Sequence, residues 1–405
     1  VAAELLLELA HRVGSGEVRH AVVALFALAL VGCGSGGDGS ATGGCTGNCQ
    51  AAAPVALGGA DGERVIAQAV GEAQARNTPA TIAVVDRVGN VLGVFRMVGA
   101  AATFAISSGR NVQGGLEGID VLPSELAAIA KAVTGAYLSS EGNAFSTRTA
   151  SQIVQENFNP RETGQPSGPL FGVQFSQLSC SDVVRHAGAG SIGPKRSPLG
   201  LSADPGGLPL YKNGVLVGGV GVIADGLYSL DLDIQNVDVD SDELIAVAAS
   251  TGFAAPLDRR ADRITADGRT LRFTDSETIV SNPALSALFP AIAGSAGVLV
   301  NVPGYGGSPI AAGTSFGSAA SGIRAETQAP LSALGAYVLV DAVNVNRFPA
   351  RAGTDGLMTA AEATQLLASA LDVANRARAQ IRRPLGSPAQ VTISAAFGCP
   401  FEGEV

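Results

Sequence analysis

The dipeptide Asn213–Gly214 constrains the fold of this chain more than any other short segment. It lies between the apolar segments GGLPLYK and VLVGGVGVIA, and Asn-Gly suits the two left-handed positions of a type I′ turn. A second hairpin is predicted upstream, where the apolar runs 80–86 and 91–96 flank Gly89 and Asn90. Two hairpins of this kind predict an antiparallel sheet.

Three segments with helical character accompany the hairpins. Residues 61–76 place apolar side chains on one helical face. A second helix is predicted to begin at Ser124, which is suited to be its N-cap. A third begins at Asp242 and Glu243, whose charges suit the positive end of a helix dipole. The chain is therefore predicted to combine helices with β-hairpins.

The composition is that of a folded protein. Apolar residues reach 46% and charged residues only 15%, so the chain carries enough apolar surface to bury a core. The 35 acidic and 26 basic residues give a net charge of −9. This balance argues against a nucleic-acid-binding protein, which needs a basic face to neutralise phosphates.

The first sixty residues predict an exported, anchored protein. The apolar run 21–32 is shorter than the roughly 20 residues of a membrane-spanning helix and fits a signal peptide. It ends in Leu-Val-Gly-Cys33, which resembles the lipobox of bacterial lipoproteins. We therefore expect a signal peptide over 1–33 with an over-extended start, lipid on Cys33, a Gly/Ser-rich tether over 34–60, and anchoring to the cell envelope at the outer membrane, the periplasm or the cell surface.

Five sequence blocks carry a family resemblance. In chain order they are the helix 61–76, TIAVVDRVGNVLGVFR, AKAVTGAYLS, GGLPLYKNGVLVGGVGV and DELIAVAA. This order resembles the GlcG/HbpS family of haem-binding proteins, sometimes called haem-degrading. The resemblance covers 61–255 and implies an α+β fold. The expected domain has two layers, is profilin-like or PAS-like with long loop inserts, has an antiparallel sheet with helices on one side, and assembles into homo-oligomers.

An internal repeat predicts a second, shortened copy of the same domain. LLASALDVAN (366–375) repeats VIAQAVGEAQ (65–74), and VTIS (391–394) repeats ATIA (80–83). We assign 356–405 to this truncated copy. Residues 256–355 are interpreted as an insert or linker region that partly covers the first domain.

Haem is the ligand that the resemblance implies. Haem iron takes an axial His, Met, Tyr or Cys, and its propionates pair with Arg or Lys. His186 is the candidate iron ligand, with Lys195 and Arg196 as propionate partners in the same loop, although the loop could equally be an exposed basic segment. Met97 and Tyr211 are alternative iron ligands, with core or edge packing as their other interpretation.

Three further positions match the pattern of the family. Arg96 ends the first hairpin, Lys131 lies within the second helix, and Gly207 opens the second hairpin. We predict them as ligand-binding residues, while the glycine could equally serve turns and packing.

The remaining sequence motifs give only weak indications of a functional site. The acidic residues between Asp231 and Glu243 are interpreted as a solvated loop, with a loose calcium site as the alternative, because the run fails the EF-hand pattern. A close pair of buried carboxylates is not expected. The G-x-S-x-G at 313–317 has no downstream histidine to activate a serine, and the G-x-G-x-x-G at 188–193 lacks the flanking strand and helix of a dinucleotide site.

Together these observations predict an extracytoplasmic, lipid-anchored binding protein for haem or a related small ligand. Two alternatives stay open. One is a haem-degrading or small-organic-acid enzyme, and the other is a structural or signalling surface lipoprotein without a ligand.

Overall fold

The structure of the protein is a computed structural model. It describes residues 55–109, 116–153, 191–231, 233, 236–266, 268–353 and 356–376. The chain divides into two units, Val1–Thr46 and Gly47–Val405, and every described residue belongs to the second. The predicted signal peptide and Cys33 lie outside the described residues, as do His186 and the repeat at 391–394. None of the described helices is both long and apolar enough to cross a membrane.

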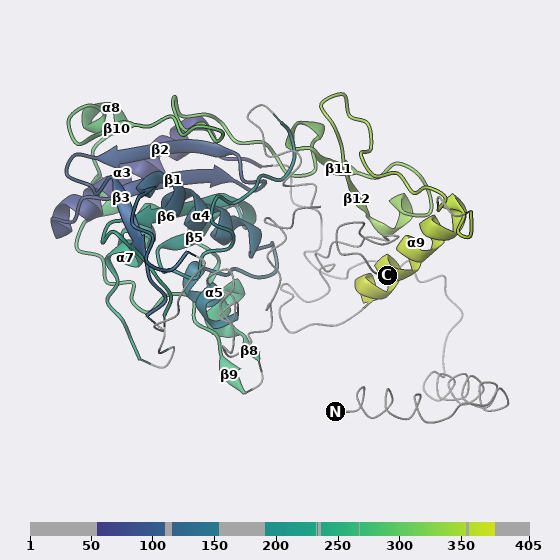
Figure 1. Ribbon diagram of the computed structural model, residues 1–405, viewed down its shortest axis with the longest axis horizontal. Coiled ribbons are helices and arrows are strands. Elements are labelled where there is room, and N and C mark those ends of the chain that lie inside the picture. The colour runs from purple at the N-terminus through teal and green to yellow at the C-terminus, as the bar shows by residue number, and fades with distance from the viewer. Residues whose placement is uncertain are drawn as a thin grey trace. The chain divides into compact units, whose positions relative to one another are not determined.

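The longer elements follow the predicted order of helices and hairpins (Figure 1). The helices are α3 (Gly59–Arg76), α4 (Ser124–Tyr137), α5 (Thr147–Ile153), α7 (Ser241–Ala249), α8 (Phe289–Ile292) and α9 (Ala360–Arg376). The strands are β1 (Thr81–Asp86), β2 (Val91–Met97), β3 (Thr103–Ile106), β4 (Leu122–Pro123), β5 (Gly207–Lys212), β6 (Val215–Ile223), β7 (Leu227–Tyr228), β8 (Thr265–Ala266), β9 (Arg269–Thr270), β10 (Gly297–Leu299), β11 (Ile323–Ala325) and β12 (Tyr337–Leu339).

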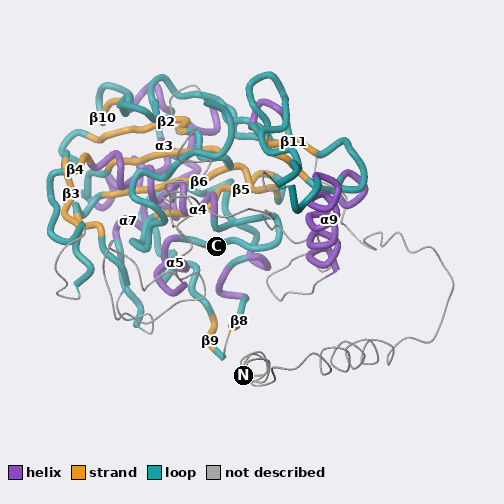
Figure 2. Tube along the Cα trace, turned by 45° about the vertical axis from the view of Figure 1, so that its right-hand side comes forward, coloured by secondary structure: helices purple, strands orange, loops and turns teal. Residues whose placement is uncertain are grey.

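Both predicted hairpins are confirmed, and they join into one antiparallel sheet of order β10-β2-β1-β6-β5 (Figure 2). β1 pairs with β2 and β5 pairs with β6. The central contact is β1 with β6, which aligns Ala83 with Gly221. In the β5–β6 turn, Asn213 and Gly214 have φ values of 54° and 77°, as a type I′ turn requires.

Helices cover both faces of this sheet, so the expected arrangement with helices on one side is wrong. The α4 side chains pack with alternate β1 residues such as Ala83 and Val85. The α3 and α7 side chains pack with the intervening residues, such as Ile82 and Val84. The reason is visible in the strands themselves, because β1 and β6 are buried along their whole length, and strands covered on both faces are continuously apolar.

Glycines let α4 lie directly on the backbone of β6. A Cβ atom on Gly219 would lie 2.2 Å from the carbonyl oxygen of Ala132, and one on Gly221 would lie 2.1 Å from that of Ala128. Any side chain at these positions would push the helix away. The glycine run in β6 therefore sets the spacing between the helix and the sheet.

The segment predicted as an insert adds to the first domain. β10 extends the sheet beside β2, with Val298 opposite Arg96. Residues earlier in the segment contact α3, where the buried carboxylate of Glu72 accepts hydrogen bonds from the backbone amides of Val280 and Ser281. Segments about 200 residues apart in sequence thus share one core.

The start of α4 differs from the prediction. Ser124 is the first residue of the helix rather than its N-cap, a position that Pro123 takes. The Ser124 hydroxyl donates instead to the carbonyl oxygen of Ala101 at 2.8 Å. The serine therefore ties the helix start to the preceding loop.

Candidate functional site

A lysine ammonium lies buried between two carboxylates. Lys131 is fully buried within α4, and its Nζ lies 2.5 Å from Oδ2 of Asp204 and 2.7 Å from Oδ2 of Asp242. The remaining oxygen of Asp204 accepts from the amide and hydroxyl of Ser229, and that of Asp242 accepts from the amide of Ala224. The two carboxylates therefore tie α4 and α7 to the loop that follows β6.

The pKa values in this cluster depend on the contact of one buried cation with two carboxylates. Burial raises the pKa of Asp204 to about 7, although Lys131 acts in the opposite direction. Burial also raises the pKa of Asp242 well above its usual value. Burial alone would lower the pKa of Lys131, but attraction to Asp204 and Asp242 raises it above its ordinary range. The lysine therefore stays charged, while the two carboxyl groups compete for that charge.

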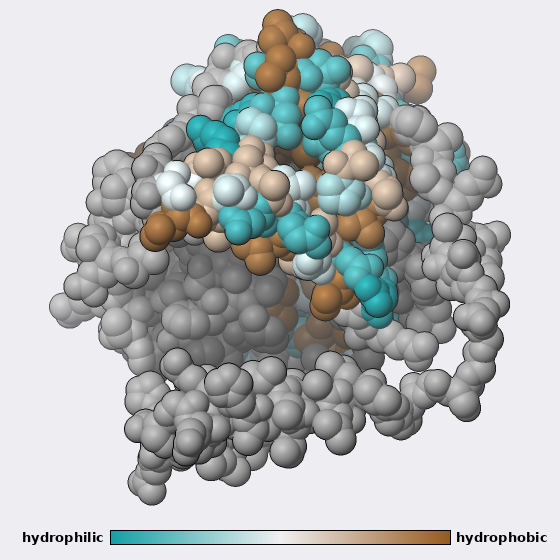
Figure 3. All heavy atoms as spheres, turned by 90° about the vertical axis from the view of Figure 1, so that its right-hand side faces the viewer, coloured by the Kyte–Doolittle hydropathy of each residue, from teal (hydrophilic) through white to brown (hydrophobic). Residues whose placement is uncertain are grey.

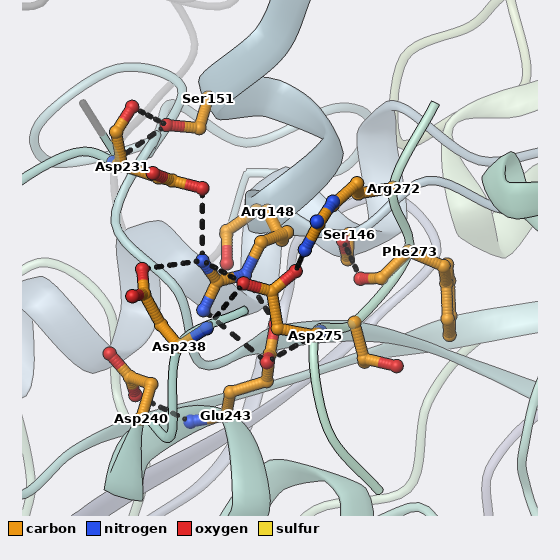
Figure 4. Close-up of polar contacts among 12 residues, drawn as sticks. Ser146, Arg148, Ser151, Asp231, Asp238, Asp240, Glu243, Arg272, Phe273 and Asp275 are labelled. Atoms are coloured by element: carbon orange, nitrogen blue, oxygen red, sulfur yellow. Dashed lines mark hydrogen bonds and ion pairs between the residues drawn. The ribbon is translucent and has the colours of Figure 1, made fainter. Parts of the chain in front are cut away.

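A second buried cation, Arg148, is surrounded by four carboxylates (Figure 4). Its Nε lies 2.9 Å from Oε1 of Glu243, and its Nη1 lies 3.0 Å from Oδ2 of Asp231 and 3.0 Å from Oδ2 of Asp275. Asp238 lies slightly farther away, at 3.4 Å. Burial raises the pKa of Glu243 to about 7, although Arg148 opposes the shift.

The two cations are linked through neighbouring residues on two helices. Asp242 and Glu243 are consecutive near the start of α7, and Asp240 caps that helix by accepting from the Glu243 amide at 2.9 Å. On α5, Thr147 precedes Arg148, and its hydroxyl accepts from the amide of Gly207. We call the set of Lys131, Arg148 and their six partner carboxylates the buried ion network; those partners are Asp204, Asp231, Asp238, Asp242, Glu243 and Asp275.

The buried ion network corrects two predictions. Asp231, Asp242 and Glu243 are not solvated, since they are 7%, 2% and 1% exposed. Asp204 and Asp242 also form the close, buried carboxylate pair that was not expected. The physical reason is that Lys131 and Arg148 provide buried positive charge, which makes burial of the carboxylates tolerable.

A cation could in principle bind three of these carboxylates. Ligand oxygens of Asp231, Asp238 and Asp275 lie within 4.8 Å of one another, and carboxylate oxygens are the ligands that calcium prefers. However, the Arg148 guanidinium already contacts all three carboxylates. In this structure the arginine supplies the positive charge that the alternative calcium interpretation assigned to a metal.

A second group of cationic side chains lies near the β1–β2 turn, where the buried carboxylate of Asp86 also acts on Lys195. The Lys195 amide donates to the carbonyl oxygen of Val88 at 2.8 Å, and its Nζ donates to the neutral oxygens of Ser191. Arg347 lies nearby, with Nη1 3.5 Å from the Cβ position of Gly193. Burial lowers the pKa of Lys195, and repulsion by Arg347 lowers it further, while Asp86 acts in the opposite direction.

Arg196 adds an exposed positive charge beside this pair. Its charge acts on Tyr305, whose pKa is nevertheless raised by burial. Among the described residues, no carboxylate forms an ion pair with Lys195 or Arg196. We call Lys195, Arg196 and Arg347 the basic end.

The other predicted site residues lie in the packed parts of the domain. Met97 is buried, and its Sδ accepts from the Ala80 amide at 3.4 Å. Tyr211 is buried, and its hydroxyl donates to the Ser140 carbonyl oxygen at 2.5 Å. Both side chains are therefore engaged in packing, and their iron-ligand roles stay predictions.

Arg96, Lys131 and Gly207 have structural contacts of their own. Arg96 pairs with Glu125 of α4 at 2.9 Å. A Cβ atom on Gly207 would lie 2.4 Å from the carbonyl oxygen of Lys131, so this glycine permits the close contact between β5 and α4. The contacts described for these three residues do not involve the basic end. Their ligand-binding roles also stay predictions.

Sequence reasoning missed Arg148, Asp204 and Asp275. Arg148 lies in the polar segment STRTASQ, which shows no apolar periodicity. Its contacts with Asp231 and Glu243 join residues 83 and 95 positions apart. Only Lys131, a charge inside an otherwise apolar helix face, signalled that a buried anion was needed.

The described residues thus define an α+β domain with an antiparallel sheet between helices, a buried ion network on one side and a basic end near the first hairpin turn.

No protein-family model matches the chain, and neither does any curated protein. Similar solved structures include the PduOC:Heme complex, with 22% identity and a TM-score of 0.30 over 49% of this chain and 96% of that one. Klebsiella pneumoniae protein ORFY has 19% identity and a TM-score of 0.29 over 51% of this chain and 96% of that one. HbpS has 18% identity and a TM-score of 0.27 over 51% of this chain and 96% of that one. Likeness at this level does not define a function.

Proposed function

We propose that this protein binds an anionic small molecule at the basic end, and that haem is the candidate ligand. The observation that carries the proposal is that Lys195 and Arg196 are consecutive near the β1–β2 turn, and that no described carboxylate forms an ion pair with either of them. The charge of Arg347 acts on Lys195 and helps to lower its pKa, although Asp86 acts in the opposite direction. An anion at these side chains would receive charge-assisted hydrogen bonds, which makes them suited to bind a carboxylate or phosphate group.

The chemistry of haem fits the described residues in part. Its propionates would pair with Lys195, Arg196 and Arg347, because charge-assisted hydrogen bonds to carboxylates are among the strongest available. Met97 and Tyr211 are less suited as iron ligands than His186, because the Met97 Sδ and the Tyr211 hydroxyl already have hydrogen-bond partners in the core. The iron ligand in this proposal is therefore His186, which lies outside the described residues and precedes Lys195 in the same part of the chain.

Binding is preferred to catalysis because Lys131 and its two carboxylate partners are closed to solvent. Lys131 is 0% exposed, and Asp204 and Asp242 are 3% and 2% exposed. A carboxyl group with a pKa of about 7 suits proton transfer, but a substrate must reach it. We therefore assign the network to the stability of the fold.

The proposal also places the protein outside the cytoplasm. This part rests on the apolar run 21–32 and on Cys33, which resemble a signal peptide and lipobox. Labelling of cells with a radioactive fatty acid, with Cys33→Ser as the control, tests it. Label on the wild type that is lost in C33S supports lipid anchoring, and an unlabelled wild type contradicts it.

A haem titration followed by absorbance tests the ligand. We expect a saturable Soret shift that is lost in His186→Ala, and an affinity at least tenfold weaker in Lys195→Ala with Arg347→Ala. Arg351→Ala is the matched control, because Arg351 is an exposed arginine outside the basic end. The absence of a saturable shift in the wild type, or equal weakening by R351A, would overturn the proposal.

A further inference from the structure

One side of α9 carries an exposed apolar stripe. Leu366 is 51% exposed and Val373 is 65% exposed, with Ala370 exposed between them. The positions i, i+4 and i+7 lie on one face of a helix. Figure 3 views the molecule from the side on which α9 lies in Figure 1, and it shows apolar side chains among hydrophilic ones.

A different side of α9 holds the helix to its own chain. Ala368 is buried, and the side-chain amide of Asn375 donates to the carbonyl oxygen of Leu334 at 2.9 Å. Ala368 and Asn375 lie about half a turn around the helix from the stripe. Attachment of α9 therefore leaves the face of Leu366, Ala370 and Val373 open.

The charges beside the stripe are arranged so that they complement a second copy. Glu362 and Arg376 flank the same side of the stripe and are 14 residues apart (376 − 362), close to four helical turns. Ser369 lies midway between them. If two α9 helices pack antiparallel, each Glu362 meets the Arg376 of the other copy, and the two Ser369 residues meet near the symmetry axis. A parallel pair would leave Glu362 and Arg376 of the two copies about four helical turns apart.

We propose that α9 is a docking surface for α9 of a second copy of this chain, packed antiparallel through Leu366, Ala370 and Val373. Within one copy, Glu362 accepts from Thr359 and Arg376 pairs with Asp372. The Arg376–Asp372 pair lies on the exposed surface of the helix, where exchange for a partner across an interface costs little. Among the described contacts, Thr359 engages only Oε2 of Glu362, so Oε1 can accept from the arginine of a second copy. The apolar stripe supplies the contact, and the charges fix its direction.

The repeat sequence suggests a different partner for the α9 stripe. The test must distinguish that partner from a second α9. α9 repeats α3, and the corresponding α3 residues Val65 and Ala69 are fully buried in the first domain. The α9 stripe could in the same way be covered by another part of this chain or by a different protein. Either of those arrangements would leave two α9 helices apart.

Position-specific crosslinking of the full chain distinguishes these cases. The five cysteines are first replaced by serine, and single cysteines are then introduced as Ser369→Cys or Glu362→Cys. In the antiparallel pair, the two copies of position 369 are adjacent, while the two copies of position 362 are about 21 Å apart along the helix axis. We therefore expect a short bismaleimide to link S369C into dimers and to leave E362C monomeric.

Further substitutions identify the surface. Leu366→Glu and Val373→Glu should reduce the S369C crosslink at least tenfold, while Leu357→Glu, at an exposed leucine outside α9, should leave it unchanged. Glu362→Arg and Arg376→Glu should each weaken the crosslink, and the double reversal should restore it. An unchanged melting temperature confirms that each variant is folded. Equal linking at positions 362 and 369, no linking at position 369, or linking that survives L366E would each overturn the proposal.

Discussion

Arg148 and Glu243 face each other at the starts of two helices, with Nε of the arginine 2.9 Å from Oε1 of the glutamate and both side chains 1% exposed. The pair joins α5 to α7. Because each charge is removed from water, neither is tolerable without the other. This relationship makes the buried ion network the most sensitive part of the domain.

Replacement of Arg148 should therefore be severe. We expect Arg148→Met to lower the free energy of unfolding by about 3–5 kcal/mol, because it leaves four carboxylates without their shared cation. Urea denaturation measures the change. Arg376→Met is the control, since its ion pair with Asp372 is largely exposed and should contribute only about 0–1 kcal/mol. A loss below about 1 kcal/mol in R148M would show that the network is not needed for stability.

Stability should also depend on pH near neutrality. The pKa values of Asp204 and Glu243 are about 7 in the folded protein, against ordinary values of 3.8 and 4.5. The folded state therefore holds more protons than the unfolded state between these values. Stability is greatest at the acidic end of this range and is lost as the pH rises through 7.

We expect the free energy of unfolding to be larger at pH 5.5 than at pH 8.5, by about 2 kcal/mol for each group. Asp204→Asn and Glu243→Gln should each flatten the profile. The comparison is made above pH 5 because Asp61 and Glu72 have lowered pKa values. These two carboxylates stabilise the folded state, and that stabilisation is lost as the pH falls further. A wild-type stability that rises from pH 5.5 to 8.5 would contradict the assigned direction.

A buried amide on α3 predicts a stabilising substitution. Gln68 is 1% exposed, and within the described part of the chain neither its amide nitrogen nor its carbonyl oxygen has a hydrogen-bond partner. Burying such a group is costly, so Gln68→Leu should raise the free energy of unfolding by about 1–3 kcal/mol. Thermal melting checks this, with Gln365→Leu on the exposed side of α9 as the control. A lower melting temperature for Q68L than for the wild type would show that the amide contributes to stability.

The two hairpins could be predicted from sequence because their signals are local. Asn213 and Gly214 specify a turn, and the flanking strands then pair without reference to the rest of the chain. The coverage of the sheet was predicted wrongly, although the apolar runs of β1 and β6 already indicated strands with two buried faces. A continuous apolar run in a strand indicates that both of its faces are covered.

The buried ion network could not be predicted in the same way. Lys131 and Asp242 are 111 residues apart, and no spacing rule connects them. An aspartate in a polar loop has the same sequence signature whether it is solvated or buried against a cation. The environment of a charge is set by tertiary contacts, which a local pattern does not contain.

The place of β10 at the edge of the sheet has a consequence for how the chain can be divided. A fragment that ends near residue 255 would keep both hairpins but would lose the strand that pairs with β2. The unpaired backbone groups of β2 would then be open to strands of other molecules, which is a common route to aggregation. A domain drawn along the sequence resemblance would therefore expose a sheet edge that the longer chain covers.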